Sequence, residues 1–356
     1  MTRPVARPAA VLLALCVAAL PGAPLRAQVA LTGAGSTFFN PLATRWFSEY
    51  QKRTGKRINY QSIGSGGGIR QFTQGTVDFG ATDGPMNDKQ IAAVQGNVAH
   101  LPVTLGAVVI TYNLALPPGT VLRLDAPTIA DIFLGRIISW NDPRIAALNP
   151  GISFPKLDIL VTHRSDGSGT TYVFTDFLGK ASPEWESRVG HGTAVKWPVG
   201  LGGKGNEGVT QQVKQWEGAL GYVEFSYARA NRLQYASLRN AAGAFVAPSL
   251  EGISAAAAGT PLAPDTDFRV SIVNAPAKDA YPIASYVWLL ARRDGGDPAR
   301  AATLRDFLAY AFTPAAQQLG AAIGYAPLPA SVMALAAKRA AALGGGSPRA
   351  PAAASR

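Results

Sequence analysis

The chain contains almost no cysteine and few histidines. Its one cysteine, Cys16, lies in an apolar stretch near the N-terminus, so disulfide bonds and thiol chemistry are excluded for the chain beyond it. Leu15 precedes Cys16 where a lipoprotein signal would place a small residue, so we expect no lipid attachment there. The three histidines, His100, His163 and His191, lack the spacing of a metal site. We therefore expect no bound metal and no other cofactor.

A long apolar run is also missing. A membrane-spanning helix needs about 20 apolar residues, and the run at residues 9–20 is shorter. Arg3 and Arg7 precede this run, and Ala27 follows it closely. This pattern predicts a signal peptide at residues 1–27 that is cleaved near Ala27, and hence a secreted, soluble chain.

Acidic residues are scarce. The sequence has 22 Asp and Glu against 33 Lys and Arg, a formal net charge of +11. Without the three arginines of the predicted signal peptide, about +8 remains, and such a surface can steer an anion toward the chain. The basic residues are scattered and no nucleic-acid motif is present, so we expect no nucleic-acid partner.

The most informative stretch surrounds Arg164. Residues 159–161 predict a buried strand, and residues 170–178 predict a helix that ends before Gly179. The first N–H groups of a helix lack intrahelical acceptors and carry the positive end of its dipole, so the turn between these elements favours an anion. Arg164 can add a two-pronged ionic contact, and Asp166 can hold its guanidinium in one pose.

A similar turn lies near the start of the predicted mature chain. Residues 31–38 predict a short strand and a turn that leads into a helix. Its potential donors are Ser36, Thr37 and the amide of Phe38. These are small groups of the type that binds a tetrahedral oxyanion.

Two further turns have related chemistry. Residues 63–69 follow a strand and precede a helix, and their glycines allow close backbone approach while Ser65 supplies a hydroxyl. Residues 77–83 end another strand at Asp83. A carboxylate suits an anion site only if the anion carries a proton that it can donate. The four turns together predict a site for one small protonated oxyanion.

These turns, with residues 59–68, 195–206 and 221–224, resemble the periplasmic phosphate-binding proteins of the phosphate-specific ABC transporter, the PstS family. The resemblance covers about residues 29 to 333. It implies that inorganic phosphate is bound by residues of all four turns. The expected contacts are Thr37, Phe38 through its main chain, Ser65, Asp83, Arg164, Ser168, Gly169 and Thr170, with Asp166 as the partner of Arg164.

Three positions beside the expected site depart from the family pattern. Ser36 and Gly66 stand where close relatives often have alanine and serine, and His163 stands where they often have a second arginine. None of these departures removes an expected phosphate contact, but His163 changes the charge expected beside Arg164.

The length and the alternation of strands and helices predict more than one core. The resemblance implies the α/β fold of a type II periplasmic binding protein, with two α/β lobes joined by a hinge and the ligand in the cleft. We expect residues 28–103 plus 276–333 to form lobe I and residues 104–275 to form lobe II. Residues 334–356 are rich in Ala, Gly, Ser and Pro, which predicts a disordered tail with at most one terminal helical turn.

The function that the resemblance implies is transport without catalysis. A monomeric chain would bind inorganic phosphate with high affinity in the periplasm and deliver it to the membrane permease subunits of a phosphate ABC transporter. A receptor for sulfate or molybdate would share this architecture, but Asp83 would repel a fully deprotonated anion.

An enzyme is the rival class. A serine-dependent phosphatase would use Ser168 as nucleophile, His163 as base and Asp166 to orient that base. Asp166 is better placed to hold Arg164, and the serine lacks the Gly-x-Ser-x-Gly pattern. A metal-dependent phosphatase would need clustered histidine and carboxylate ligands, which the sequence does not offer.

Overall fold

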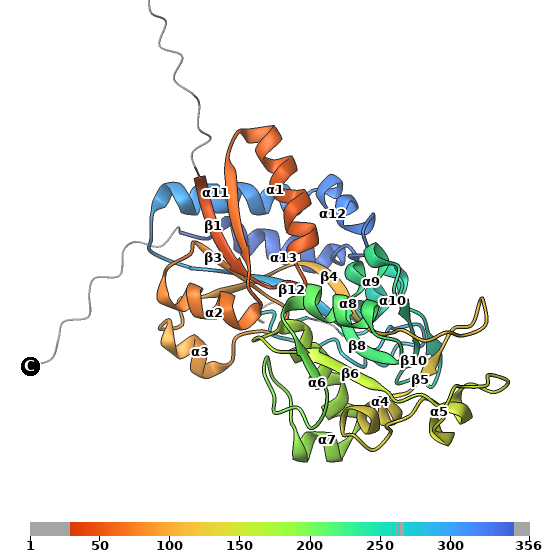
Figure 1. The fold of residues 1–356 in the computed structure, drawn as a ribbon. Coiled ribbons are helices and arrows are strands. Elements are labelled where there is room, and N and C mark those ends of the chain that lie inside the picture. Colours follow the sequence, from red (N-terminus) through yellow and green to blue (C-terminus); the bar gives the residue numbers. More distant parts are fainter. Residues whose placement is uncertain (1–28, 261, 264–266, 345–356) are drawn as a thin grey trace, which may run out of the picture.

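The computed structural model describes residues 29–260, 262–263 and 267–344, in which strands and helices alternate (Figure 1). The predicted signal peptide lies outside the described residues. The strands are β1 (Val29–Gly35), β2 (Arg57–Ser62), β3 (Phe79–Thr82), β4 (Ala99–Tyr112), β5 (Arg123–Leu124), β6 (Leu160–Arg164), β7 (Leu201–Gly203), β8 (Ala219–Glu224), β9 (Gln234–Tyr235), β10 (Ser237–Arg239), β11 (Phe245–Val246) and β12 (Ala284–Ala291).

The helices cover both faces of the main sheet. They are α1 (Asn40–Thr54), α2 (Ser65–Gln74), α3 (Asp88–Ala93), α4 (Ala126–Phe133), α5 (Pro143–Leu148), α6 (Gly169–Ala181), α7 (Pro183–Arg188), α8 (Gly205–Gln215), α9 (Phe225–Asn231), α10 (Leu250–Ala258), α11 (Pro298–Ala311), α12 (Pro314–Ala321) and α13 (Ala330–Ala341).

One long strand, β4, holds the molecule together. The main sheet has the order β2-β1-β3-β12-β4-β8-β6-β7, and β9 also pairs with β4. Residues 99–107 of β4 pair with β12, whereas residues 108–112 pair with β8. We call the strands from β2 to residue 107 of β4 the first sheet half, and those from residue 108 to β7 the second. Every residue of β4 is buried, which suits a strand covered on both faces.

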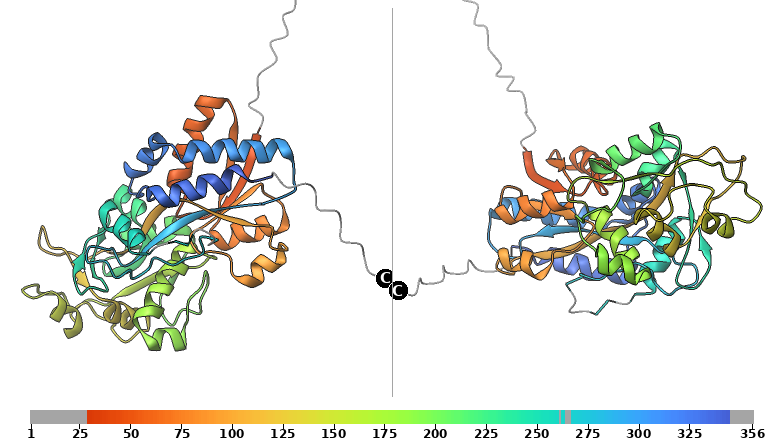
Figure 2. Two further views of the ribbon diagram at one scale, coloured as in Figure 1. Left: turned by 180° about the vertical axis from the view of Figure 1, so that it is seen from behind. Right: turned by 60° about the horizontal axis from the view of Figure 1, so that its bottom comes forward.

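Both sheet halves are covered by helices on two faces. In the first half, the apolar side of α1 packs with α11 through Trp46, Phe47 and Phe307, while α2 belongs to a separate apolar cluster with Phe72 and Ile69. Figure 2 shows α11 and α13 side by side on one face of this half. In the second half, Tyr222 of β8 stacks on Phe174 of α6. The neighbouring Gly221 faces α8, because adjacent strand residues point to opposite faces.

The element around Arg164 differs from its predicted bounds. Strand β6 runs from Leu160 to Arg164, so Arg164 ends the strand instead of lying in the turn. The helix does not end before Gly179, as predicted, but continues to Ala181. Gly179 lies inside the helix beside Glu186 of α7, so it does not mark the end of the helix. The helix ends where Pro183 starts α7.

The prediction of a disordered tail from residue 334 was wrong for residues 334–344. Helix α13 extends from Ala330 to Ala341 and packs against β4 and α11. Its Val332, Ala336 and Ala340 are buried, as is Leu343 beyond the helix. Alanine has the highest helix propensity and small side chains allow close packing, so the composition that suggested disorder suits a docked helix. The rest of the predicted tail, residues 345–356, lies outside the described residues.

No helix in residues 29–260, 262–263 and 267–344 is both long and apolar enough to cross a membrane.

The docking of α13 can be tested by placing a charge on either face. Ala336 is fully buried, whereas Ala334 on the same helix is exposed. We expect Ala336→Asp to lower the free energy of unfolding by about 3 kcal/mol or more, because it buries an unpaired carboxylate. The matched variant Ala334→Asp should cost less than about 1 kcal/mol. Urea unfolding of both variants measures this, and equal effects would mean that α13 is not docked.

Candidate functional site

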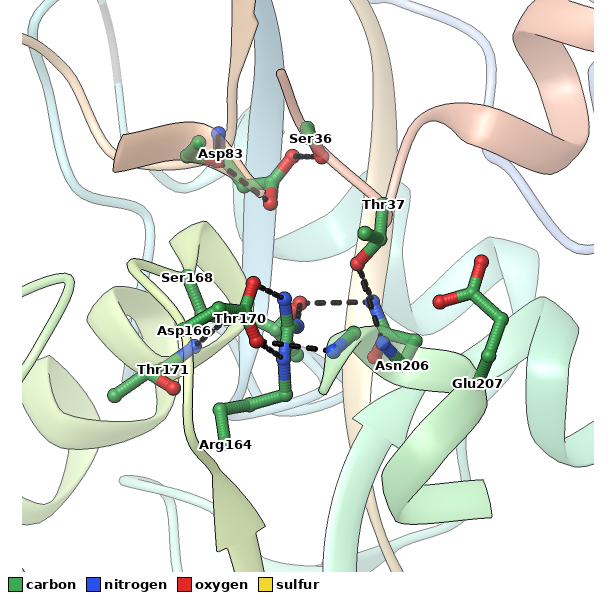
Figure 3. Close-up of polar contacts among 12 residues, drawn as sticks. Ser36, Thr37, Asp83, Arg164, Asp166, Ser168, Thr170, Thr171, Asn206 and Glu207 are labelled. Carbon is green, nitrogen blue, oxygen red and sulfur yellow. Dashed lines mark hydrogen bonds and ion pairs between the residues drawn. The ribbon is translucent and has the colours of Figure 1, made fainter. Parts of the chain in front are cut away.

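The ends of four strands meet at one buried polar cluster (Figure 3). Thr37 follows β1, Ser65 opens α2 after β2, Asp83 follows β3, and Arg164 ends β6. Each of these four residues is at most 3% exposed. The predicted site residues Phe38, Ser168, Gly169 and Thr170 are also buried here. Strand ends at the junction of two sheet regions are where α/β proteins place ligands.

Asp83 lies on the side of the first sheet half. Ser36 Oγ donates to its Oδ1 at 2.5 Å, and Ser65 Oγ lies 3.4 Å from its Oδ2. Burial raises the pKa of Asp83 to about 7, although Ser36, Arg164 and Ser65 each favour the ionised form. The carboxyl group therefore changes its protonation state near neutral pH.

Arg164 faces Asp83 from the second sheet half and is held by a forked ion pair. Its Nε donates to Asp166 Oδ1 at 2.8 Å and its Nη2 to Oδ2 at 2.6 Å. The backbone N–H of Gly205 also donates to Asp166, at 2.9 Å. Burial alone would raise the pKa of Asp166, but the bonds from Arg164 and Gly205 outweigh it, so this pKa is lowered. This ion pair is the contact between Asp166 and Arg164 that the sequence predicted.

The N-terminus of α6 supplies further donors. Ser168 is its N-cap, and its Oγ accepts the N–H of Thr171 at 3.0 Å. The amides of Gly169 and Thr170 lie in the first turn, where a helix leaves its N–H groups without intrahelical acceptors. A side chain at Gly169 would strike Asp83 and Ser65, so glycine is required for the close approach of α6 to the first sheet half.

Hydrogen bonds join the side of the first sheet half to the side of the second sheet half across the cluster. Gly66 N donates to Gly167 O at 2.9 Å. Tyr227 Oη donates to Thr37 O at 2.7 Å, and Asn206 Nδ2 donates to Thr37 Oγ1 at 2.8 Å. Residues far apart in the sequence thus form one continuous polar cluster.

Two buried residues of this cluster were missed from the sequence. Asn206 is 0% exposed and contacts Thr37 and Thr170. Glu224 is also 0% exposed, and its Oε2 accepts the N–H of Ser226 and lies 3.2 Å from Tyr325 Oη. Burial raises the pKa of Glu224 to about 8. A polar residue at a helix start after a glycine-rich stretch was the only local signal for Asn206.

The chain was compared with known proteins. A model of the PBP superfamily domain matches residues 22–315. The chain is 43% identical over 314 residues to the phosphate-binding protein PstS of Xylella fastidiosa (strain 9a5c), a match that covers 88% of this chain and 85% of that relative. It is 42% identical over 303 residues to PstS of Pasteurella multocida (strain Pm70), with 85% and 87% covered. The chain belongs to the PstS family.

The fold agrees with this membership. The crystal structure of the phosphate binding protein from Stenotrophomonas maltophilia matches with a TM-score of 0.65 at 18% identity, covering 86% of this chain and 93% of that one. This confirms the predicted α/β fold of a type II periplasmic binding protein. The relatives are named as binding proteins and not as enzymes, which confirms the non-enzymatic interpretation of this PstS family member.

The rival catalytic triad is not assembled. His163 stacks on Trp197 with ring centroids 4.7 Å apart, and its Nδ1 lies 3.1 Å from the carbonyl oxygen of Arg164. Burial lowers the pKa of His163, which favours the neutral ring beside Arg164. Asp166 is bound to Arg164, and Ser168 caps α6.

The buried carboxyl of Asp83 predicts a pH dependence of stability. Its pKa rises from the ordinary 3.8 to about 7, so between these values the folded chain keeps a proton that the unfolded chain releases. The free energy of unfolding then falls as pH rises through this range. The free energy of unfolding of Asp83→Asn, measured relative to wild type, should rise by up to about 4 kcal/mol between pH 4 and pH 7. Above pH 7 this difference should stay constant.

Unfolding in buffers free of phosphate and sulfate measures this difference. The exposed Asp88, changed to Asn, is the control. If the difference between Asp83→Asn and wild type did not change with pH, Asp83 would ionise at its ordinary pKa.

Proposed function

We propose that this chain binds one inorganic phosphate ion at the buried cluster and delivers it to the permease of a phosphate ABC importer. The observation that carries the proposal is the arrangement of many donors and one carboxylate acceptor around a fixed guanidinium. The naming of its relatives as phosphate-binding proteins supports the same ligand. The proposed contacts are Thr37, the main chain of Phe38, Ser65, Asp83, Arg164, Ser168, Gly169 and Thr170.

The chemistry of the cluster matches phosphate near neutral pH. Phosphate is a tetrahedral ion with several acceptor oxygens and at least one P–O–H group. Hydroxyls, amides at the start of α6 and Arg164 can donate to its oxygens. Asp83 can accept its proton, whereas sulfate and molybdate have no proton to offer. The ionised carboxylate of Asp83, present above its pKa of about 7, is thus a repulsive element against these ions.

We further propose that binding closes two lobes. The lobes are residues 28–103 plus 276–333 and residues 104–275, with α13 extending the first of them to residue 344. Strand β4 changes its pairing partner after residue 107, which supports a connection between the two lobes near the proposed boundary at residues 103 and 104. Since Thr37 and Ser65 lie on one side and Ser168 and Thr170 on the other, a phosphate ion contacting both sides would select the closed form.

The proposal places the mature, monomeric chain in the periplasm after removal of residues 1–27. A charge of about +8 on the mature chain would draw phosphate toward it. A calorimetric titration of the refolded, phosphate-free protein with phosphate and, separately, with sulfate tests the function. Tight binding of phosphate alone is expected, and binding of sulfate with equal affinity would reject the proposed ligand.

Removal of Arg164 should nearly abolish phosphate binding. Arg164→Ala leaves Asp166 as an unpaired carboxylate beside the anion, at a cost of about 3–5 kcal/mol, or roughly a thousandfold in affinity. Arg144→Ala removes an exposed arginine that is paired with Asp131 and Asp142 and should leave the affinity unchanged. Calorimetric titration with phosphate measures the affinities of both variants. A loss below tenfold for Arg164→Ala would place Arg164 outside the binding site.

Asp83→Asn should admit sulfate. The amide keeps one acceptor oxygen for the phosphate proton and adds two N–H donors that sulfate can accept. Phosphate affinity should fall by less than about tenfold, since one hydrogen bond to a charged ion is weakened but kept. Displacement of labelled phosphate by sulfate at pH 8 should become measurable. Asp88→Asn is the control, and if Asp83→Asn still rejected sulfate fully, discrimination would lie in other groups.

A further inference from the structure

Asn206 joins two of the proposed phosphate contacts from opposite sides of the site. It is the second residue of α8, and its side chain is fully buried. Its Nδ2 donates to Thr37 Oγ1 at 2.8 Å and to Thr170 Oγ1 at 3.1 Å (Figure 3). Nothing in the proposed function assigns a role to this residue.

The orientation of the Asn206 amide is fixed by its other end. Its Oδ1 accepts the backbone N–H of Glu224 at 2.9 Å. A backbone N–H can only donate, so the atom facing it must be the amide oxygen. The amide nitrogen, which can only donate, therefore has to face the two threonine hydroxyls.

The acceptor capacity of both hydroxyls is then filled. Thr37 Oγ1 accepts from Asn206 Nδ2 and also from the backbone N–H of Asn206 at 3.3 Å. Thr170 Oγ1 accepts from Asn206 Nδ2 and from Arg164 Nη1 at 3.2 Å. A hydroxyl has two acceptor sites and one proton. Among the described residues, neither hydroxyl donates a hydrogen bond to another group, so each keeps its proton for a ligand.

We propose that Asn206 is a positioning residue that commits the Thr37 and Thr170 hydroxyls to donation and thereby sets the site for an acceptor-rich anion. The inference rests on the proposed function, because it names what orients two of the proposed phosphate donors. Thr37 follows β1, whereas Thr170 lies in α6 and Asn206 in α8. The complete arrangement exists only when the two sides are in contact, so the donors are oriented as the site closes.

The test compares a neutral variant with a matched control. Asn206→Leu keeps a similar volume, removes both donors and excludes water from their place. Without them, each threonine hydroxyl loses one of the two donors that commit its proton to a ligand, and we expect phosphate to bind about 10- to 100-fold more weakly. Asn113 follows β4 and donates through its Nδ2 to Lys214 O, which is not among the proposed phosphate contacts, so Asn113→Leu should bind phosphate like wild type.

A double-mutant cycle with Thr37→Val separates orientation from a general structural effect. If Asn206 acts through the hydroxyl of Thr37, changing Asn206 to Leu in the Thr37→Val background should weaken phosphate binding by a clearly smaller factor than the same change does in wild type. A purely structural role would give the same factor in both backgrounds. An equal loss of phosphate affinity in the two backgrounds would therefore overturn the proposal even if Asn206→Leu weakened binding.

A second variant covers failure of Asn206→Leu to fold. Asn206→Asp keeps the shape, turns the donor into an acceptor and adds a negative charge, so it should lose at least as much affinity. The charge repels the anion in either background, but the loss should still be smaller beside Thr37→Val, because the part that acts through the Thr37 hydroxyl is absent there. Binding by either Asn206 variant within threefold of wild type would overturn the role of Asn206 while wild type and Asn113→Leu still uphold phosphate binding. Failure of wild type to bind phosphate would overturn both.

Discussion

The arrangement of the site depends on keeping one buried guanidinium neutralised. The side chain of Arg164 is 1% exposed, and Asp166, two residues further along the chain, is the carboxylate that compensates it. Because both residues belong to one strand end and its turn, the ion pair forms within one side of the molecule. Asp166 also accepts the N–H of Gly205, so the same carboxylate fixes where α8 starts. The position of Asn206 follows from that start.

Two further buried carboxyl groups lie nearby, and burial raises the pKa of each. Asp83 has a pKa of about 7 and Glu224 of about 8, and the negative charge of Asp83 contributes to the latter. Near neutral pH, Glu224 is therefore mostly protonated, which limits the negative field at a site proposed for an anion. Its Oε2 accepts the N–H of Ser226 and lies 3.2 Å from Tyr325 Oη, whose one proton is donated to the carbonyl of Phe38. Glu224 thus braces the backbone beside the proposed ligand.

Local patterns predicted those parts of the fold and site that depend on neighbouring residues. The turns after β1, β2 and β3, the helix that follows the first of these turns and the pairing of Arg164 with Asp166 all follow from short-range spacing. What the sequence could not predict depends on contacts between distant segments. The division of β4 between two partners needs β8 and β12, and Asn206 is defined by Thr37 and Thr170. Helix α13 was missed because the burial of its small side chains depends on contacts with β4 and α11.

The charges of the site nearly cancel, and this determines how it can bind an anion. Arg164 is paired with Asp166, and Asp83 adds a negative charge when ionised. Among the residues of the cluster that the structure describes, no second cation compensates a bound phosphate ion. Affinity must then come from oriented neutral dipoles: the first amides of α6 and the hydroxyls of serine and threonine. A hydroxyl helps an anion only if its proton points inward. The orientation of Thr37 and Thr170 is therefore as important to the proposed function as the charge of Arg164.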